Sequence, residues 1–90
     1  MNTFNGKFIA DNGSIHYYCN GLPHRVDGPA IEHPNGTKSY HNHGTFHRLD
    51  GPAIEYASGR KSYYINGIQY DEETYWIQIH KELGIDPDNN

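Results

Sequence analysis

Apolar and polar side chains alternate in short runs along residues 1–70, with glycine-containing turns between the runs. This alternation is typical of β-strands that bury one face, and Asn-Gly turns favour tight antiparallel hairpins. From Asp71 onward the apolar side chains recur at helical spacing. They are Trp76, Ile79 and Leu83, and the polar His80 falls at the same spacing. The pattern therefore predicts short hairpins, then a helix over 71–84 with Trp76 in the core, and a polar tail over 85–90.

The hairpin pattern repeats itself with a fixed period. Residues 24–32 return as residues 47–55, 23 residues later, with Val26 replaced by Leu49. A short period indicates stacked copies of one unit that is too small to bury a core alone. We predict one domain over 1–90, with repeats at approximately 1–22, 23–45 and 46–70. Self-association through the exposed aromatic patch described below is an alternative to partner binding there, so a homo-oligomer is an alternative to a monomer.

Each unit carries two turns, and the turns predict the strand register. The first turns lie at residues 12–13, 35–36 and 58–59. Taken as two-residue type I′ turns, they pair Phe8 with Tyr17, Ile31 with Tyr40, and Ile54 with Tyr63. The second turns, at 20–21, 43–44 and 66–67, pair Tyr17 with His24, Tyr40 with His47, and Tyr63 with Tyr70. The fold class is therefore all-β: an antiparallel meander of hairpin repeats with one C-terminal α-helix.

The step Asp-Gly-Pro occurs at residues 27–29 and 50–52, and we expect a structured corner at each. Gly28 and Gly51 allow either a positive φ or a close backbone approach, and we expect them to be structural. Pro29 and Pro52 lack an amide donor, so we do not expect the strand to continue through them.

Composition excludes some classes of function. The formal charge is −4 and the isoelectric point is about 5.9, which argues against general nucleic-acid or membrane binding. The single cysteine, Cys19, permits no intrachain disulfide. We find no leader or long apolar span in the sequence, so a cytoplasmic protein is expected.

The repeated motif His-Arg-x-Asp-Gly-Pro-Ala-x-Glu and the 23-residue period resemble MORN-type repeats, in the variant found in small phage and large-virus proteins. The resemblance covers roughly residues 5–80. It implies a β-hairpin scaffold that binds other molecules. It also implies a phage-type accessory, or anti-defence, protein that binds and inhibits a host protein in the host cytoplasm. The alternative is a sponge that sequesters a small phosphorylated or nucleotide signal.

Two sets of residues are candidates for these roles. A ligand site would use histidine, arginine and tyrosine, because arginine binds phosphate and aromatic rings stack on a base. Its candidates are His24, Arg25, His47, Arg48, Tyr17 and Tyr40. Structurally, the same arginines would pair with acids of the repeat. A partner surface would be an exposed aromatic patch on the opposite face. Its candidates are Tyr18, His41, Phe46 and Tyr64.

Catalysis and metal binding have weaker support in the sequence. Cys19 has no base at a matching position of the predicted sheet, and a nucleophile needs one. His41, His43 and His47 lie close in sequence, but His43 falls in a turn. We predict neither an enzyme nor a resident metal or cofactor.

Overall fold

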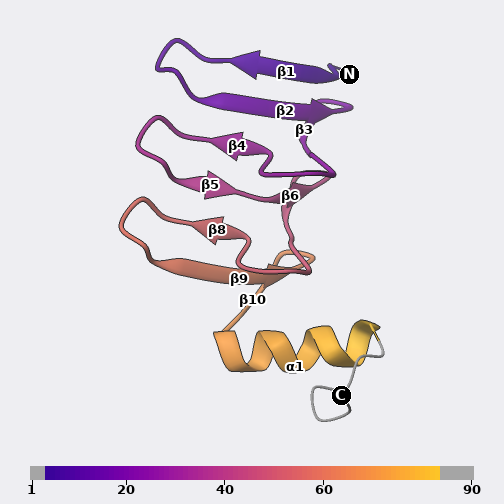
Figure 1. Cartoon of the computed structure of the whole chain (residues 1–90). Coiled ribbons are helices and arrows are strands. Elements are labelled where there is room, and N and C mark those ends of the chain that lie inside the picture. The colour runs from indigo at the N-terminus through magenta and orange to yellow at the C-terminus, as the bar shows by residue number, and fades with distance from the viewer. Residues whose placement is uncertain (1–3, 84–90) are drawn as a thin grey trace.

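The computed structural model describes residues 4–83, which form a stack of short strands with a helix across one end (Figure 1). The strands are β1 (Gly6–Ile9), β2 (Ile15–Cys19), β3 (Leu22–Pro23), β4 (Ile31–Glu32), β5 (Lys38–Ser39), β6 (His41–Asn42), β7 (Thr45–Phe46), β8 (Ile54–Glu55), β9 (Lys61–Ile65) and β10 (Ile68–Tyr70). The helix is α1 (Glu72–Leu83). The chain therefore has the predicted mainly-β fold with one C-terminal helix.

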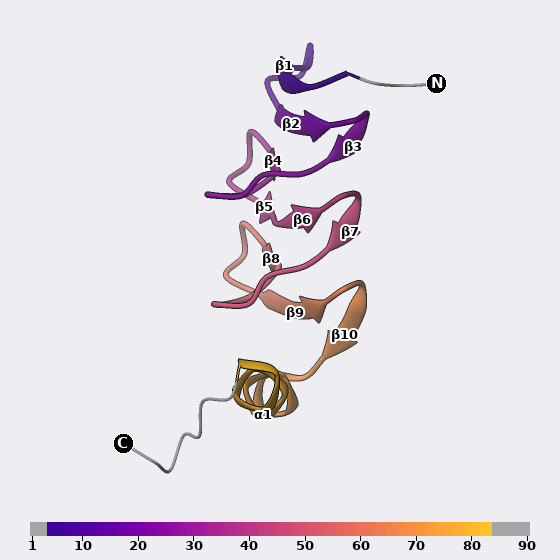
Figure 2. The same cartoon turned by 90° about the vertical axis from the view of Figure 1, so that its right-hand side faces the viewer.

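All the strand pairs are antiparallel. The main sheet has the order β1-β2-β4-β5-β8-β9-β10, with β3 paired to β2, and β6 and β7 form a separate hairpin. Seen from the side, the chain makes the same zigzag in successive layers, and α1 lies below the last layer (Figure 2).

The second turn of each unit has the predicted register. Asn66 and Gly67 both have positive φ, at 50° and 82°, as a type I′ turn requires. Tyr63 accordingly pairs with Tyr70. The equivalent turns contain Asn20, Gly21, His43 and Gly44, which also have positive φ.

The first turn of each unit differs from the prediction by one residue. Ile31 pairs with Ser39 rather than Tyr40, because the loop has three residues. The Gly36 amide donates to the His33 carbonyl at 3.0 Å, and Gly36 alone takes a positive φ, at 97°. This is a type I turn followed by a left-handed glycine. In the other units Phe8 pairs with His16 and Ile54 pairs with Ser62, so the predicted Phe8–Tyr17 and Ile54–Tyr63 pairs are wrong.

Gly28 and Gly51 have a structural role because an arginine side chain lies close to their backbone, and not because their φ angles are positive. Neither Gly28 nor Gly51 has a positive φ. A Cβ atom on Gly51 would lie 3.1 Å from the Arg48 guanidinium carbon, and one on Gly28 would lie 3.2 Å from that of Arg25. The corner therefore needs glycine because an arginine lies across the backbone.

Helix α1 begins where predicted but buries a different aromatic residue. The Asp71 carboxylate accepts a hydrogen bond from the Thr74 amide at 2.7 Å, which caps the helix. Tyr75 is fully buried and packs with Ile79, Tyr63 and Ile65, while Trp76 is only partly buried beside them. The prediction of Trp76 as the core residue is thus off by one position. The predicted stop at Gly84 and the tail lie outside the described residues.

Candidate binding groove

The corner segments, residues 24–30 and 47–53, are each held by one arginine. Arg48 donates from Nε to Asp50 at 2.9 Å, and from Nη1 to Glu55 at 2.9 Å and to the Pro52 carbonyl at 3.0 Å. Burial lowers the pKa of Arg48, but the bonds to Asp50 and Glu55 outweigh it and raise the pKa above its ordinary value. The guanidinium is therefore neutralised inside its own repeat.

Arg25 repeats the arrangement with longer bonds. It donates to Asp27 at 3.2 Å and to Glu32 at 3.3 Å, and its Nη1 reaches the Pro29 carbonyl at 3.2 Å. The Arg25 side chain is 27% exposed and that of Arg48 is 20% exposed. The structural interpretation of these arginines therefore has direct geometric support in both copies.

Each arginine also stacks on a tyrosine 8 residues earlier in the chain. The guanidinium carbon lies 3.9 Å from the ring centroid of Tyr17 for Arg25, and 3.9 Å from that of Tyr40 for Arg48. Such cation–π stacking ties one layer to the next. Burial is the main cause that raises the pKa of Tyr40. Tyr17 and Tyr40 thus contribute to the joint between layers.

Tyr63, one period after Tyr40, stacks on a residue of helix α1 instead of on an arginine. The Tyr75 ring lies 4.9 Å from the Tyr63 ring, centroid to centroid. Its hydroxyl donates to the Arg48 carbonyl and accepts from the Gly51 amide at 3.3 Å. Tyr75 therefore takes the place that an arginine fills in the layers above, which explains why this residue is buried instead of Trp76.

The two repeated histidines also join layers. His24 Nδ1 accepts from the backbone amide of His43 at 3.1 Å, and His47 Nδ1 accepts from that of Asn66 at 2.9 Å. The Asn5 side chain does the same for the Asn20 amide, at 2.9 Å. Each type I′ turn is thus tied to the preceding layer. Burial lowers the pKa of His47, which favours the neutral ring that can accept this bond.

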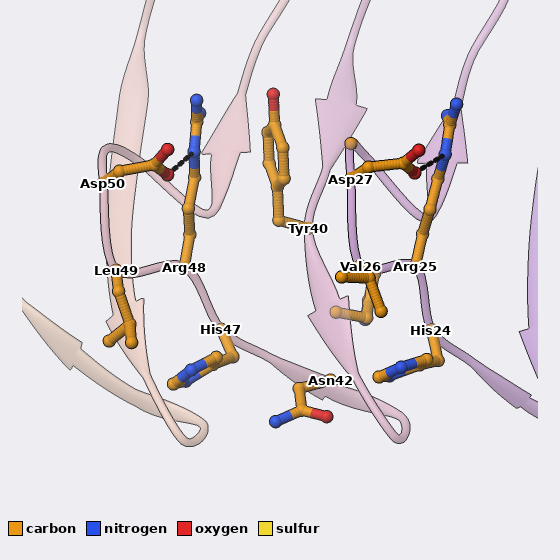
Figure 3. A pocket seen from close by; sticks show the side chains of 12 residues that line it. His24, Arg25, Val26, Asp27, Tyr40, Asn42, His47, Arg48, Leu49 and Asp50 are labelled. Atoms are coloured by element: carbon orange, nitrogen blue, oxygen red, sulfur yellow. Dashed lines mark hydrogen bonds and ion pairs between the residues drawn. The ribbon is translucent and has the colours of Figure 1, made fainter.

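Between the two corners lies a groove of about 500 Å³ (Figure 3). Tyr40 stands between Arg25 and Arg48 along its wall, and His24, His47 and Asn42 lie at the other end. Five of the six predicted ligand residues therefore line one groove, and Tyr17 is the exception.

The rim of the groove exposes apolar and acidic side chains side by side, which the sequence did not reveal. Val26 is 91% exposed and Leu49 38% exposed, and beside them the Asp27 and Asp50 side chains are 85% and 86% exposed. We call these four residues the corner rim. Their signal in the sequence is an apolar residue at the variable motif position in both copies, on a segment too rich in Gly and Pro to form a strand.

The predicted partner surface is not an open patch. His41 is buried, and its ring lies 4.7 Å from Phe46, which in turn lies 5.0 Å from Tyr64. These rings are a small satellite core. Tyr18 belongs to another cluster, 5.7 Å from Phe4 and 6.0 Å from His16. The expectation of exposed rings is therefore wrong for His41, and Tyr18, Phe46 and Tyr64 are half-buried beside other rings.

The histidines that suggested metal have other partners. His41 Nε2 bonds the Ser39 hydroxyl at 3.0 Å, and His43 Nδ1 bonds the Asn42 side chain at 2.7 Å. Within residues 4–83, no group of three or more His, Cys, Asp or Glu side chains is placed to hold a metal ion. Cys19 is half-buried and unpaired by any disulfide in this part of the chain.

Comparisons with known proteins add no relative: no protein-family model, curated protein or solved structure matches this chain. Over the described residues, no helix has the length and apolar character needed to cross a membrane.

Proposed function

We propose that this chain is a non-enzymatic binding protein that recognises a partner protein through the corner rim. The observation that carries the proposal is the repetition of one apolar–acidic pair, Val26-Asp27 and Leu49-Asp50, on two exposed corners. Each arginine behind the rim is paired with two carboxylates, the rim aspartate and a glutamate, so each corner keeps an excess of one negative charge beside its apolar side chain. A partner with apolar pockets bordered by Lys or Arg is complementary to it.

The repeat also sets the spacing of the two pairs. Strands β4 and β8 follow the two corners and are separated by β5 alone, so the corners lie about 10 Å apart, two strand spacings. A rigid scaffold with two matched contacts loses little conformational entropy on binding. The resemblance to small viral MORN-like proteins extends this proposal to a phage accessory protein that occupies and inhibits a host protein in the host cytoplasm.

The test removes the apolar half of the rim. Val26→Ser with Leu49→Ser should leave the fold intact, because both side chains are exposed, and should weaken partner binding by about tenfold or more. The matched control is Ile68→Ser with Ile77→Ser, two exposed residues outside the corners. Quantitative mass spectrometry of host proteins retained by each variant gives the readout. Equal retention by both double variants would contradict the proposal.

The second candidate is the nucleotide sponge, favoured by one observation. The groove has a volume in the range of small-ligand sites and is lined by Tyr40, His24 and His47. Two paired arginines and two exposed carboxylates oppose phosphate binding there, which ranks this candidate second.

Calorimetry with a panel of linear and cyclic nucleotides separates the two functions. Heat that disappears in folded Arg48→Ala would establish the sponge. Absence of heat in the wild type, with rim-dependent retention of a partner, would establish the protein-binding function. If nucleotides do bind, Asp27→Asn with Asp50→Asn should strengthen binding, because the change removes two negative charges.

A further inference from the structure

Strand β1 lies at the end of the main sheet, and no strand of residues 4–83 occupies its outer backbone edge. Within residues 4–83, β1 pairs with β2 alone. The equivalent strands one and two periods later are paired on both sides: β4 with β2 and β5, and β8 with β5 and β9. The repeat therefore defines what fits this edge, namely an antiparallel strand.

The backbone groups that face outward can be assigned from the ladder. The Ala10 amide donates to the Ser14 carbonyl at 2.9 Å, so by alternation Phe8 bonds toward β2 while Lys7 and Ile9 present their amides and carbonyls outward. Ala30, one period after Lys7, uses this outward carbonyl to accept from the Tyr17 amide at 2.8 Å. The same bonding position is open at Lys7.

Side chains at this end favour association as well. Phe4, Phe8, Ile9 and Leu22 are exposed large apolar residues, and all belong to the first unit. Residues 4–22 contain one lysine and one aspartate, so they carry no net charge, whereas the whole chain carries −4. Two copies can therefore meet at this end without the repulsion that their acidic remainder would cause.

We propose that the protein forms a homodimer in which β1 pairs antiparallel with β1 of a second copy across a two-fold axis. The edge is the same on both copies, so the pairing is self-complementary. At the opposite end, α1 packs against β9 and β10, which prevents a further copy from adding there. The assembly thus closes as a dimer and does not grow into a filament.

Charge excludes one register of this pairing. A pair centred on Lys7 would place two lysines opposite each other, which is unfavourable. Centring on Phe8 places Phe8 of both copies side by side and lets Lys7 of each copy exchange hydrogen bonds with Ile9 of the other. We assign this register. The dimer would carry two corner rims, independently of what the rims bind.

Sedimentation equilibrium over a concentration series tests the dimer. We expect a dissociation constant of roughly 10–100 µM, because a four-residue strand with a few apolar contacts is a small interface. Ile9→Pro removes the outward amide, which bonds nothing within the sheet, together with the exposed Ile9 side chain, so the fold survives and dimerisation should weaken at least tenfold. Wild type that stays monomeric up to about 1 mM, or Ile9→Pro that dimerises like wild type, would overturn the proposal.

A charge pair tests the register. Phe8→Glu and Phe8→Lys should each be monomeric, since like charges would face each other, and a mixture of the two should form the heterodimer. Ile77→Glu, an exposed change on α1, is the control and should dimerise like wild type. Circular dichroism confirms the fold of each variant. A mixture that stays monomeric would overturn the assigned register, and the Ile9→Pro result would still decide the β1 edge.

Discussion

The two ends of the stack are built from the same repeat but differ in how they meet solvent. At the N-terminal end, β1 is exposed along its length and carries exposed Phe8 and Ile9. At the C-terminal end, buried and half-buried residues alternate along β9 after the exposed Lys61. Tyr75 of α1 packs on the buried residues Tyr63 and Ile65 of this strand. Among the residues whose burial is described, 4–81, the buried apolar ones lie from Ala30 onward. The difference teaches that a repeat gains its core from its neighbour, so an end is stable only where something caps it.

The largest expected effect on stability comes from removing the contact by which helix α1 caps the C-terminal end. Tyr75→Ala should lower the free energy of unfolding by about 3–5 kcal/mol, because a fully buried ring with two hydrogen bonds is lost. Trp76→Ala should cost less, since Trp76 is partly exposed. Ile77→Ala, on the exposed side of the same helix, is the control. Chemical denaturation of the three variants checks the order, and a larger effect of Trp76→Ala would contradict it.

The joint between the last two layers is tighter than the one before it. A Cβ atom on Gly67 would lie 2.6 Å from Thr45 Cγ2, whereas the nearest atom to one on Gly44 would be in the Leu22 side chain, at 3.4 Å. Gly67→Ala should therefore cost about 2–4 kcal/mol, from left-handed backbone strain plus overpacking. Gly59→Ala has similar strain but no neighbour, and should cost about 1 kcal/mol.

A rescue separates the two causes of that loss. Thr45→Ser removes the methyl group that Gly67→Ala would strike. In that background, thermal melts of Gly67→Ala and Gly59→Ala should converge. A gap that persists would show that the contact with Thr45 is not the cause.

Loss of Arg48 should destabilise the fold more than loss of Arg25, although by less than the changes above. Arg48 is less exposed than Arg25 and has shorter bonds to its two acids. Arg48→Ala should cost about 1–2 kcal/mol after allowance for the exposed Asp50 partner, and Arg25→Ala should cost less. Urea unfolding of both variants measures the difference. Equal losses would mean that the layers are not graded in this way.

Acid should destabilise the fold through His47 and His41. Burial lowers the pKa of both His47 and His41 in the folded chain, so these groups add stability above the unfolded pKa of about 6.5 and lose it as pH falls below that value. Between about pH 7.5 and pH 5 we expect a loss on the order of 1 kcal/mol.

His47→Asn tests the source of that acid sensitivity. An Asn side-chain oxygen can accept the Asn66 amide without titrating, as Asn5 does for Asn20. The variant should keep much of its stability at neutral pH and show a smaller loss in acid. Melting temperatures over a pH series provide the measurement, and an unchanged pH dependence would rule out His47 as a contributor.

The period and the local turn chemistry were readable from the sequence because they depend on neighbouring residues. Asn-Gly and His-Gly at 20–21, 43–44 and 66–67 fixed the type I′ turns, and Asp71 fixed the start of α1. The first turns were not readable, since Asn-Gly suits both a two-residue turn and a type I turn that ends in a left-handed glycine. The structure has the second, and the one extra loop residue makes Phe8, Ile31 and Ile54 pair with His16, Ser39 and Ser62 instead of the predicted tyrosines.

The repeated motif, by itself, determined that His24, Arg25 and their copies would occupy equivalent places. Only the tertiary structure decided what they do there, because hydrogen bonds and stacking between layers join residues 8 to 19 positions apart. Periodicity also predicted a helical cap but could not select Tyr75 over Trp76. Tyr75 is buried because its hydroxyl bonds the Arg48 carbonyl and the Gly51 amide of the preceding corner. Its ring also packs on Tyr63, in the place where an arginine stacks on Tyr17 and Tyr40.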